Sequence, residues 1–220
     1  MSAVDNEEAE AGKTAGANAT SAAKSDRRGR LMRLIDANYG THRGFVRLVL
    51  GEAEYLAGRL NPYLQPDLAA TRRLVFVCLG NINRSAFAEA VARAVGLNTV
   101  SIGLSTSTGA PAFEMTVATS RHFGLDLTEH KATNLPDYEF RNGDLLLAME
   151  VRHVHRLRSN GIPETAIALL GHWATPHRIH IQDPHTLSEA YFRTCFTIIQ
   201  SAVRELAVQC RAAASPCVAP

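Results

Sequence analysis

Residues 74–91 read LVFVCLGNINRSAFAEAV, and this stretch decides the fold of the chain. It opens with an apolar run ending at Val77 that lacks period-two alternation, which is typical of a buried parallel strand. Cys78 follows, and then a turn at 79–83 that is rich in Gly and Asn. From Ala88 onward apolar residues repeat every three or four positions, which predicts a helix. The stretch therefore predicts a strand, a loop and a helix in direct succession, with a cysteine where the strand ends.

The loop between this strand and helix has the chemistry of an oxyanion-binding site. Successive backbone N–H groups in a Gly/Asn turn form a concave nest, and the helix adds the positive end of its dipole. The same field favours the thiolate of Cys78, which is a nucleophile. Arg84 offers a planar fork for two phosphoryl oxygens, and Ser85 is near enough in sequence to hydrogen-bond the thiolate and stabilise it as a leaving group. An inert core cysteine beside a helix-capping Ser85 is the alternative interpretation.

The segment resembles the phosphate loop of the low-molecular-weight protein tyrosine phosphatases, whose pattern is V-C-x-G-N-x-C-R-S-P-x-A-E. The matching positions are Val77, Cys78, Gly80, Asn81, Arg84, Ser85, Ala88 and Glu89. In that family the first cysteine becomes phosphorylated, so the resemblance implies this role for Cys78. Asn83 stands where the family usually has a second cysteine, credited with redox protection, and Ala86 stands where it has proline. These departures imply lost redox protection and a less rigid first helical turn, with hydrolysis retained.

The family also has an Asp-Pro pair just before its last helix, and Asp183-Pro184 occupies that place here. The resemblance implies that Asp183 protonates the leaving phenolate and then activates the attacking water. Pro184 fixes the backbone after the acid. The alternative interpretation is an ordinary turn before a helix. His185 replaces the tyrosine that usually helps to clasp the aromatic ring of the substrate, so this departure bears on substrate choice more than on chemistry.

The resemblance covers about 74–206 and implies a phosphate-binding set made of Leu79, Gly80, Asn81, Ile82, Asn83, Arg84 and Ser85. Further matching segments are Ser101–Leu104, His130–Ala132, Asp144–Glu150 and Leu169–Trp173. In the first of these, the resemblance implies that Ser101 supports Asn81. The last looks most like the bacterial branch associated with capsule and exopolysaccharide export. Residues 105–108, Ser-Thr-Ser-Thr, predict an unusually polar pocket rim together with His185.

Strands and helices alternate along this part of the chain. We expect strands at 74–78, 99–103, 144–149 and 166–170, and helices at 85–96, 112–124, 150–159 and 187–209. This alternation predicts an α/β fold with a parallel, doubly wound sheet covered on both faces. The resemblance implies four strands in the order 2-1-3-4. The carboxyl edge of the first strand is where such sheets bind ligands.

Composition divides the chain into four parts. Residues 1–26 are poor in bulky apolar residues, which predicts a disordered tail. Residues 27–70 form a helical N-terminal arm outside the family pattern, with one helix at 44–60 that carries an apolar face. The phosphatase domain is expected at 71–209, followed by a flexible tail at 210–220. Two interpretations of the arm stay open: a helical collar on the domain or on a dimer partner, and a basic amphipathic element that docks to a membrane surface or a kinase tail.

Composition also excludes several classes of protein. The net charge of +2 argues against nonspecific binding of nucleic acid. The four cysteines lack a paired framework and no signal peptide is evident, which predicts a reduced, cytoplasmic protein. No apolar stretch reaches the length of a membrane span. The nine histidines fit no zinc-ligand spacing, so we expect no metal and no cofactor.

Three functions compete on these observations. The leading one is hydrolysis of phosphotyrosine in a protein partner, such as a bacterial tyrosine kinase of exopolysaccharide synthesis. The second is a phosphoprotein-binding module without turnover, which the departures at Asn83, Ala86 and His185 suggest. The third, arsenate reduction, needs two further cysteines after the third strand, and residues 150–194 contain none.

Overall fold

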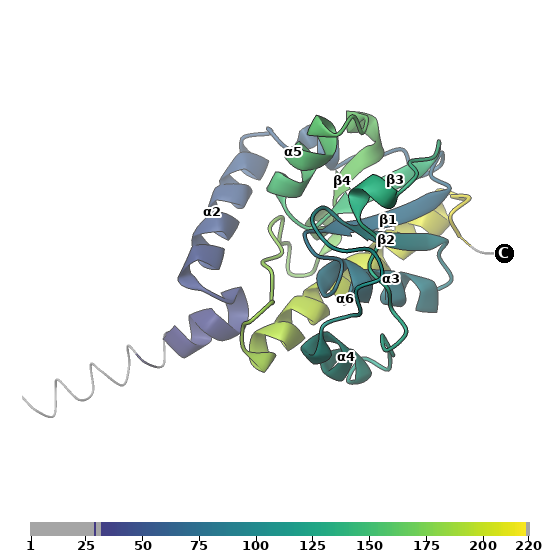
Figure 1. Cartoon of the computed structure of the whole chain (residues 1–220). Coiled ribbons are helices and arrows are strands. Elements are labelled where there is room, and N and C mark those ends of the chain that lie inside the picture. Colours follow the sequence, from purple (N-terminus) through teal and green to yellow (C-terminus); the bar gives the residue numbers. More distant parts are fainter. Residues whose placement is uncertain (1–28, 30–31, 219–220) are drawn as a thin grey trace, which may run out of the picture.

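A four-stranded parallel sheet forms the centre of the molecule (Figure 1). The computed structural model describes residue 29 and residues 32–218, so the tail expected at 1–26 lies outside the described residues. The strands are β1 Arg73–Cys78, β2 Thr99–Gly103, β3 Asp144–Ala148 and β4 Ile167–Leu169. Their order is β2-β1-β3-β4 and every pair is parallel. The expected fold class and strand order are confirmed.

Helices cover both faces of this sheet. The domain helices are α3 Arg84–Ala94, α4 Glu114–Arg121, α5 Val151–Ser159 and α6 Glu189–Ala212. Helices α3 and α6 pack against each other and share one face with α4, while α5 lies on the other face (Figure 1). Each of these helices differs from its expected bounds by one to three residues at one or both ends, most of all α4 and α6. Helix α4 stops early because the chain turns at Gly124, whose φ is +73°, and α6 begins after Ser188, whose side chain accepts a hydrogen bond from the Tyr191 N–H.

The side chains of β1 alternate between two hydrophobic cores. Phe76 and Cys78 belong to the core under α3 and α6, which also holds a stacked pair of rings, Phe87 and Phe196, 3.9 Å apart. Val77 belongs to the core under α5. Because alternate residues of a strand point to opposite faces, β1 is buried on both sides. The catalytic candidate Cys78 therefore ends a strand that the two cores hold rigidly.

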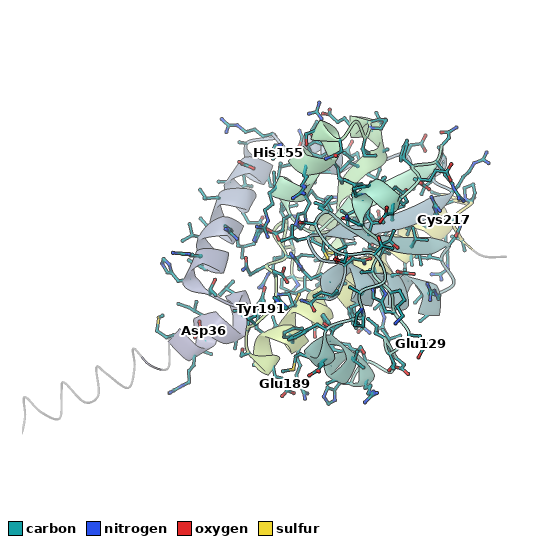
Figure 2. All side chains as sticks on the ribbon, in the orientation of Figure 1. Asp36, Glu129, His155, Glu189, Tyr191 and Cys217 are labelled. Carbon is teal, nitrogen blue, oxygen red and sulfur yellow. The ribbon has the colours of Figure 1, made fainter. Side chains whose placement is uncertain are left out.

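The segment expected as a flexible tail from residue 210 is instead packed against the domain as far as residue 218. Cys210 still lies in α6, and both Cys210 and Cys217 are fully buried. The Cys217 N–H donates to the Thr71 carbonyl, and the Cys217 carbonyl accepts from Asn98 N–H. Burial of these small apolar side chains explains the difference. Figure 2 places Cys217 on the side of the molecule away from the arm.

The N-terminal arm is helical, as expected. Residues 32–39 are helical, α2 spans His42–Leu56, and a 3-10 turn at Asn61–Tyr63 leads to the domain. Helix α2 begins before the expected residue 44 because Thr41 caps it by accepting a hydrogen bond from the Gly44 N–H. Its apolar residues Val49 and Leu56 are exposed. Its contacts with the domain instead use a face of smaller and polar residues, and this side of the helix lies along the loop that precedes α6 (Figure 1).

None of the helices in the described part of the chain is both long enough and apolar enough to cross a bilayer.

Candidate active site

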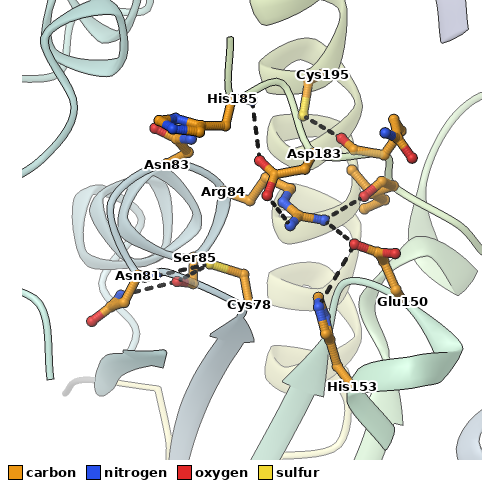
Figure 3. Close-up of polar contacts among 12 residues, drawn as sticks. Cys78, Asn81, Asn83, Arg84, Ser85, Glu150, His153, Asp183, His185 and Cys195 are labelled. Carbon is orange, nitrogen blue, oxygen red and sulfur yellow. Dashed lines mark hydrogen bonds and ion pairs between the residues drawn. The ribbon is translucent and has the colours of Figure 1, made fainter. Parts of the chain in front are cut away.

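Cys78 lies at the carboxyl end of β1, beneath the N-terminus of α3 (Figure 3). Its Sγ is 3.0 Å from Ser85 Oγ and accepts a hydrogen bond from the Asn81 backbone N–H at 3.2 Å. Ser85 Oγ itself accepts from Asn81 Nδ2 at 2.9 Å, so its hydroxyl hydrogen can point at the sulfur, which is nearer than the other acceptor, the Ile102 carbonyl at 3.5 Å. Two donors thus face the sulfur, which is the arrangement that favours a thiolate.

Asn81 organises the loop around the sulfur. Its φ of +51° is left-handed, a conformation that asparagine tolerates better than most residues. Its Nδ2 also donates to Ser101 Oγ at 2.7 Å, and its Oδ1 accepts from the Thr133 N–H at 2.8 Å. His130 Nε2 lies 2.7 Å from the Asn81 carbonyl oxygen, so this nitrogen carries the hydrogen. The loop is therefore fixed from two neighbouring segments, β2 and residues 130–133, and Ser101 contacts Asn81 as the resemblance implies.

The floor of the loop requires a glycine. A Cβ atom at Gly103, the last residue of β2, would lie 2.8 Å from Thr106 Cγ2 and 3.1 Å from both the backbone nitrogen and the Cβ of Asn81. Because the atoms of Asn81 cannot move without shifting the loop, any other residue there would displace Thr106 and press on the phosphate loop. The glycine lets β2 support the loop directly.

Several backbone donors of the loop stay open. Within the described residues, the N–H groups of Gly80, Ile82 and Asn83 donate to no protein acceptor. The loop then enters α3, whose first-turn N–H groups also point toward its N-terminal end. Open donors at a helix N-terminus, above a buried thiol, form a cradle for an oxyanion.

Arg84 is fully buried and is held along one edge of its guanidinium. Nη1 donates to Glu150 Oε1 at 2.6 Å and to the Ile181 carbonyl at 2.8 Å. Nη2 lies 2.8 Å from Asp183 Oδ2 but is not aligned for a hydrogen bond, and Nε has no partner. Burial disfavours the charge, yet Asp183 and Glu150 together raise the pKa of Arg84 above its usual value. The Nε–Nη2 edge is the one available to an oxyanion.

Glu150 is the main site residue that the sequence interpretation missed. It follows β3, is fully buried, and also accepts from Arg152 Nη2 at 2.7 Å. Burial alone would raise its pKa, but the charge of Arg84, helped by neighbouring His153, lowers the pKa of Glu150 to about 2. This carboxylate therefore stays ionised and fixes the orientation of Arg84. The sequence signal that could have identified Glu150 as a site residue is its position just after β3, at the carboxyl edge of the sheet and beside the end of β1.

The buried ring of His153 lies next to this carboxylate, with Nε2 3.6 Å from Glu150 Oε1 (Figure 3). Burial, helped by the charge of Arg84, lowers the pKa of His153 to about 3, so the ring is neutral at physiological pH. Burial also lowers the pKa of His180, which lies 3.5 Å from Glu150 Oε2. The site consequently contains one buried cation, Arg84, between two acidic side chains, Glu150 and Asp183.

Asp183 reaches the site from the loop before α6, and Pro184 behind it is buried. The His185 N–H donates to Asp183 Oδ1 at 3.2 Å. The His185 ring lies at the rim of the cradle and contacts the Phe113 ring edge to face, with the ring centroids 4.9 Å apart. Leu79 is partly exposed beside Ser105, whose N–H donates to the Leu79 carbonyl. The rim thus combines an apolar patch with polar groups.

The departures from the family pattern have local partners. Asn83 is buried, and its Oδ1 accepts a hydrogen bond from Thr116 Oγ1 at 2.6 Å, which ties the loop to α4. Ala86 is buried in the first turn of α3. Neither side chain has a hydrogen bond to Cys78 within the described residues. The structure therefore brings Asp183, from a distant part of the sequence, next to Arg84 in the loop that begins at Cys78.

Comparison with known proteins agrees with this geometry. A family model described as low molecular weight phosphotyrosine protein phosphatase matches residues 73–215. The low molecular weight protein-tyrosine-phosphatase Wzb of Escherichia coli K12 is 32% identical over 138 residues, which cover 61% of this chain and 92% of that protein.

Two solved structures of the same kind also match. The tyrosine phosphatase AmsI of Erwinia amylovora superposes with a TM-score of 0.54 at 26% identity, covering 61% of this chain and 90% of the other. Wzb of Escherichia coli K30, in complex with sulphate, gives a TM-score of 0.54 at 26% identity, covering 63% and 98%. These relatives belong to the bacterial branch that the Leu169–Trp173 motif indicates, so that expectation is confirmed. The chain belongs to the low molecular weight phosphotyrosine protein phosphatase family, and the arm lies outside the matched residues.

Proposed function

We propose that this protein hydrolyses phosphotyrosine in protein substrates through a phosphocysteine intermediate. One observation supports this above all: Cys78, Arg84 and Asp183 converge on a cradle of open backbone donors, although they come from β1, α3 and the loop before α6. A nucleophile, an anion clamp and a carboxyl acid are the three groups that this reaction needs.

In the first step, the Cys78 thiolate attacks phosphorus while the bond to the phenolic oxygen breaks. The open N–H groups of the loop and the Nε–Nη2 edge of Arg84 hold the equatorial oxygens, whose charge is spread in the transition state. Asp183 gives its proton to the departing phenolate, so that tyrosine leaves as a neutral phenol. Because Glu150 holds the other edge of Arg84, the clamp is oriented before substrate arrives.

In the second step, water attacks the phosphocysteine and Asp183 accepts its proton. The sulfur–phosphorus bond breaks and the thiolate is restored as the leaving group. The Ser85 hydroxyl, 3.0 Å from Sγ, stabilises the negative charge that returns to sulfur. Inorganic phosphate is then released from the cradle.

The substrate of this reaction is a phosphotyrosine protein, and a tyrosine kinase of exopolysaccharide synthesis is the partner we propose. The kinship with Wzb and AmsI supports that choice. The Wzb structure that holds sulphate supports binding of a tetrahedral anion by this fold.

The test is the dependence of turnover on the leaving group in Asp183→Asn. The amide cannot supply a proton, so kcat/KM for phosphotyrosine or phenyl phosphate, which reports only the steps up to release of the phenol, should fall by roughly 10²- to 10⁴-fold. The loss should be much smaller for an activated aryl phosphate, whose phenolate leaves without help. Equal losses for all leaving groups would contradict the role of Asp183 as an acid.

The wild-type protein decides between an enzyme and a phosphoprotein-binding module. Turnover of phosphotyrosine peptides supports the enzyme. Tight binding of a phosphotyrosine peptide with no phosphate release would contradict the proposal and favour the binding module. Vanadate binding by Asp183→Asn provides the control that the cradle still folds.

A further inference from the structure

We infer that the N-terminal arm is a brace for the acid-bearing loop, and that Glu52 on α2 is a positioning residue for Asp183. This inference rests on the proposed function, because it assigns Asp183 the role of acid. The arm lies outside the region shared with the family, which begins at residue 73.

Glu52 makes two contacts with the loop that leads to Asp183. Its Oε1 accepts a hydrogen bond from the Ile179 backbone N–H at 3.1 Å, and its Oε2 lies 3.2 Å from His177 Nδ1. Ile179 is fully buried, so without Glu52 its N–H would lose its acceptor in a place that water does not readily reach. The carboxylate thus holds the loop by its backbone.

The other side of the same segment is tied to the reaction centre. The Ile181 N–H donates to the Met149 carbonyl at 3.0 Å, and the Ile181 carbonyl accepts from Arg84 Nη1 at 2.8 Å. Asp183 follows two residues later and pairs with the same guanidinium. The segment is therefore held by α2 on one side and by Arg84 and α6 on the other, where Tyr191 Oη donates to the Gln182 carbonyl at 3.2 Å, and release at α2 would remove the outer support of the loop that aims Asp183.

Close packing and further contacts make the arm a continuous support. A Cβ atom at Gly51 would lie only 3.7 Å from the Cβ of His180, so α2 runs directly against the loop. Arg178 Nη1 donates to the Asn38 carbonyl at 2.6 Å, and its guanidinium lies 5.0 Å from the ring centre of Tyr39. Residues from both helical parts of the arm, 32–39 and α2, therefore contact the segment before Asp183.

Two variants of Glu52 and one control variant on the same helix test this brace. Glu52→Ala removes the acceptor for Ile179, whereas Glu52→Gln keeps an oxygen in the same place. Glu54→Ala, the matched control, removes a carboxylate of the same helix that has no hydrogen bond to residues 177–183 in the described part of the chain. Hydrogen exchange of the backbone amides at 177–183 should be about tenfold faster in Glu52→Ala and unchanged in the other two variants.

The kinetic readout separates positioning of the acid from general stability. In Glu52→Ala, kcat/KM for phenyl phosphate should fall by about tenfold, while kcat/KM for an activated aryl phosphate, whose phenolate leaves without an acid, stays within about twofold of wild type. Glu52→Gln should restore kcat/KM. Unchanged exchange in Glu52→Ala, or equal losses on both substrates, would overturn the inference. If the loss of activity in Asp183→Asn did not depend on the leaving group, the proposed function would be overturned instead. Hydrogen exchange at residues 177–183 would then be the measurement that tests whether Glu52 holds the loop.

Discussion

The buried histidine beside the anion clamp makes stability depend on pH in a way that can be calculated. His153 has a folded-state pKa of about 3, against an ordinary value of 6.5, because burial and Arg84 disfavour its charged form. The unfolded chain therefore binds a proton as pH falls through 6.5, while the folded protein does not until about pH 3. The stability contributed by neutral His153 is complete above pH 6.5 and is lost progressively below it.

The magnitude follows from linkage. A single such group lowers the free energy of unfolding by about 1.4 kcal/mol per pH unit below 6.5, which gives about 2 kcal/mol at pH 5. His180 adds a loss of the same sign, because burial lowers its pKa too. Glu150, with a pKa of about 2 against 4.5, adds its own loss only below pH 4.5, because its folded-state pKa is depressed. The interval from pH 7 to 5 therefore reports on the histidines.

The assay is urea unfolding followed by circular dichroism at pH 7, 6 and 5. His153→Leu, of similar volume and without a titrating group, should lose about 2 kcal/mol less between pH 7 and 5 than wild type does. His155→Leu changes an exposed histidine on the same helix and should keep the wild-type dependence. If His153→Leu kept the full loss between pH 7 and 5, the assignment of a buried neutral His153 would be refuted.

Two further predictions concern the nucleophile and its loop. Cys78→Ser should abolish turnover of aryl phosphates while vanadate binding persists, and more than a few per cent of residual activity would exclude Cys78 as the nucleophile. Arg84→Lys should lower kcat/KM by roughly 10²- to 10³-fold, because an ammonium cannot make a two-point clamp. Steady-state kinetics and vanadate titration measure both effects. Peroxide should inactivate the wild type with poor recovery by reductant, because Asn83 leaves no second thiol in the loop, whereas Asn83→Cys should recover; full recovery of the wild type with a Cys78 disulfide in the mass spectrum would contradict this.

The fold and the reacting residues could be predicted because their signals are local. A strand, a Gly/Asn turn and a helix start are contiguous at 74–91, and parallel strands bring their carboxyl ends to one edge. Helix ends were less predictable, since they depend on single contacts such as the Ser188 cap. The packing of the segment after α6 could not be predicted from a tail rich in alanine, because the partners of Cys217, Thr71 and Asn98, come from distant parts of the chain.

The positioning residues were not predictable for a related reason. Glu150 and His130 act only because β3 and the loop after α4 lie beside the phosphate loop in space. On α2, the conspicuous apolar pattern drew attention to side chains such as Val49, which is exposed. The contact with the domain uses Gly51 and Glu52, whose roles depend on the path of a loop far along the chain.

The departures from the family pattern modify the surroundings of the reaction and leave its centre intact. Asn83 turns its amide to Thr116, and His185 packs against Phe113, so each new side chain has a partner away from the sulfur. A phosphoprotein-binding module would also use Arg84 aligned by Glu150 to bind phosphate, but it would have no need of a carboxyl group at Asp183, 2.8 Å from the same guanidinium. The retained pair and the added brace at Glu52 both act on the same two groups, the clamp and the acid. Their joint presence favours an enzyme with altered redox behaviour and an altered rim over a binding module.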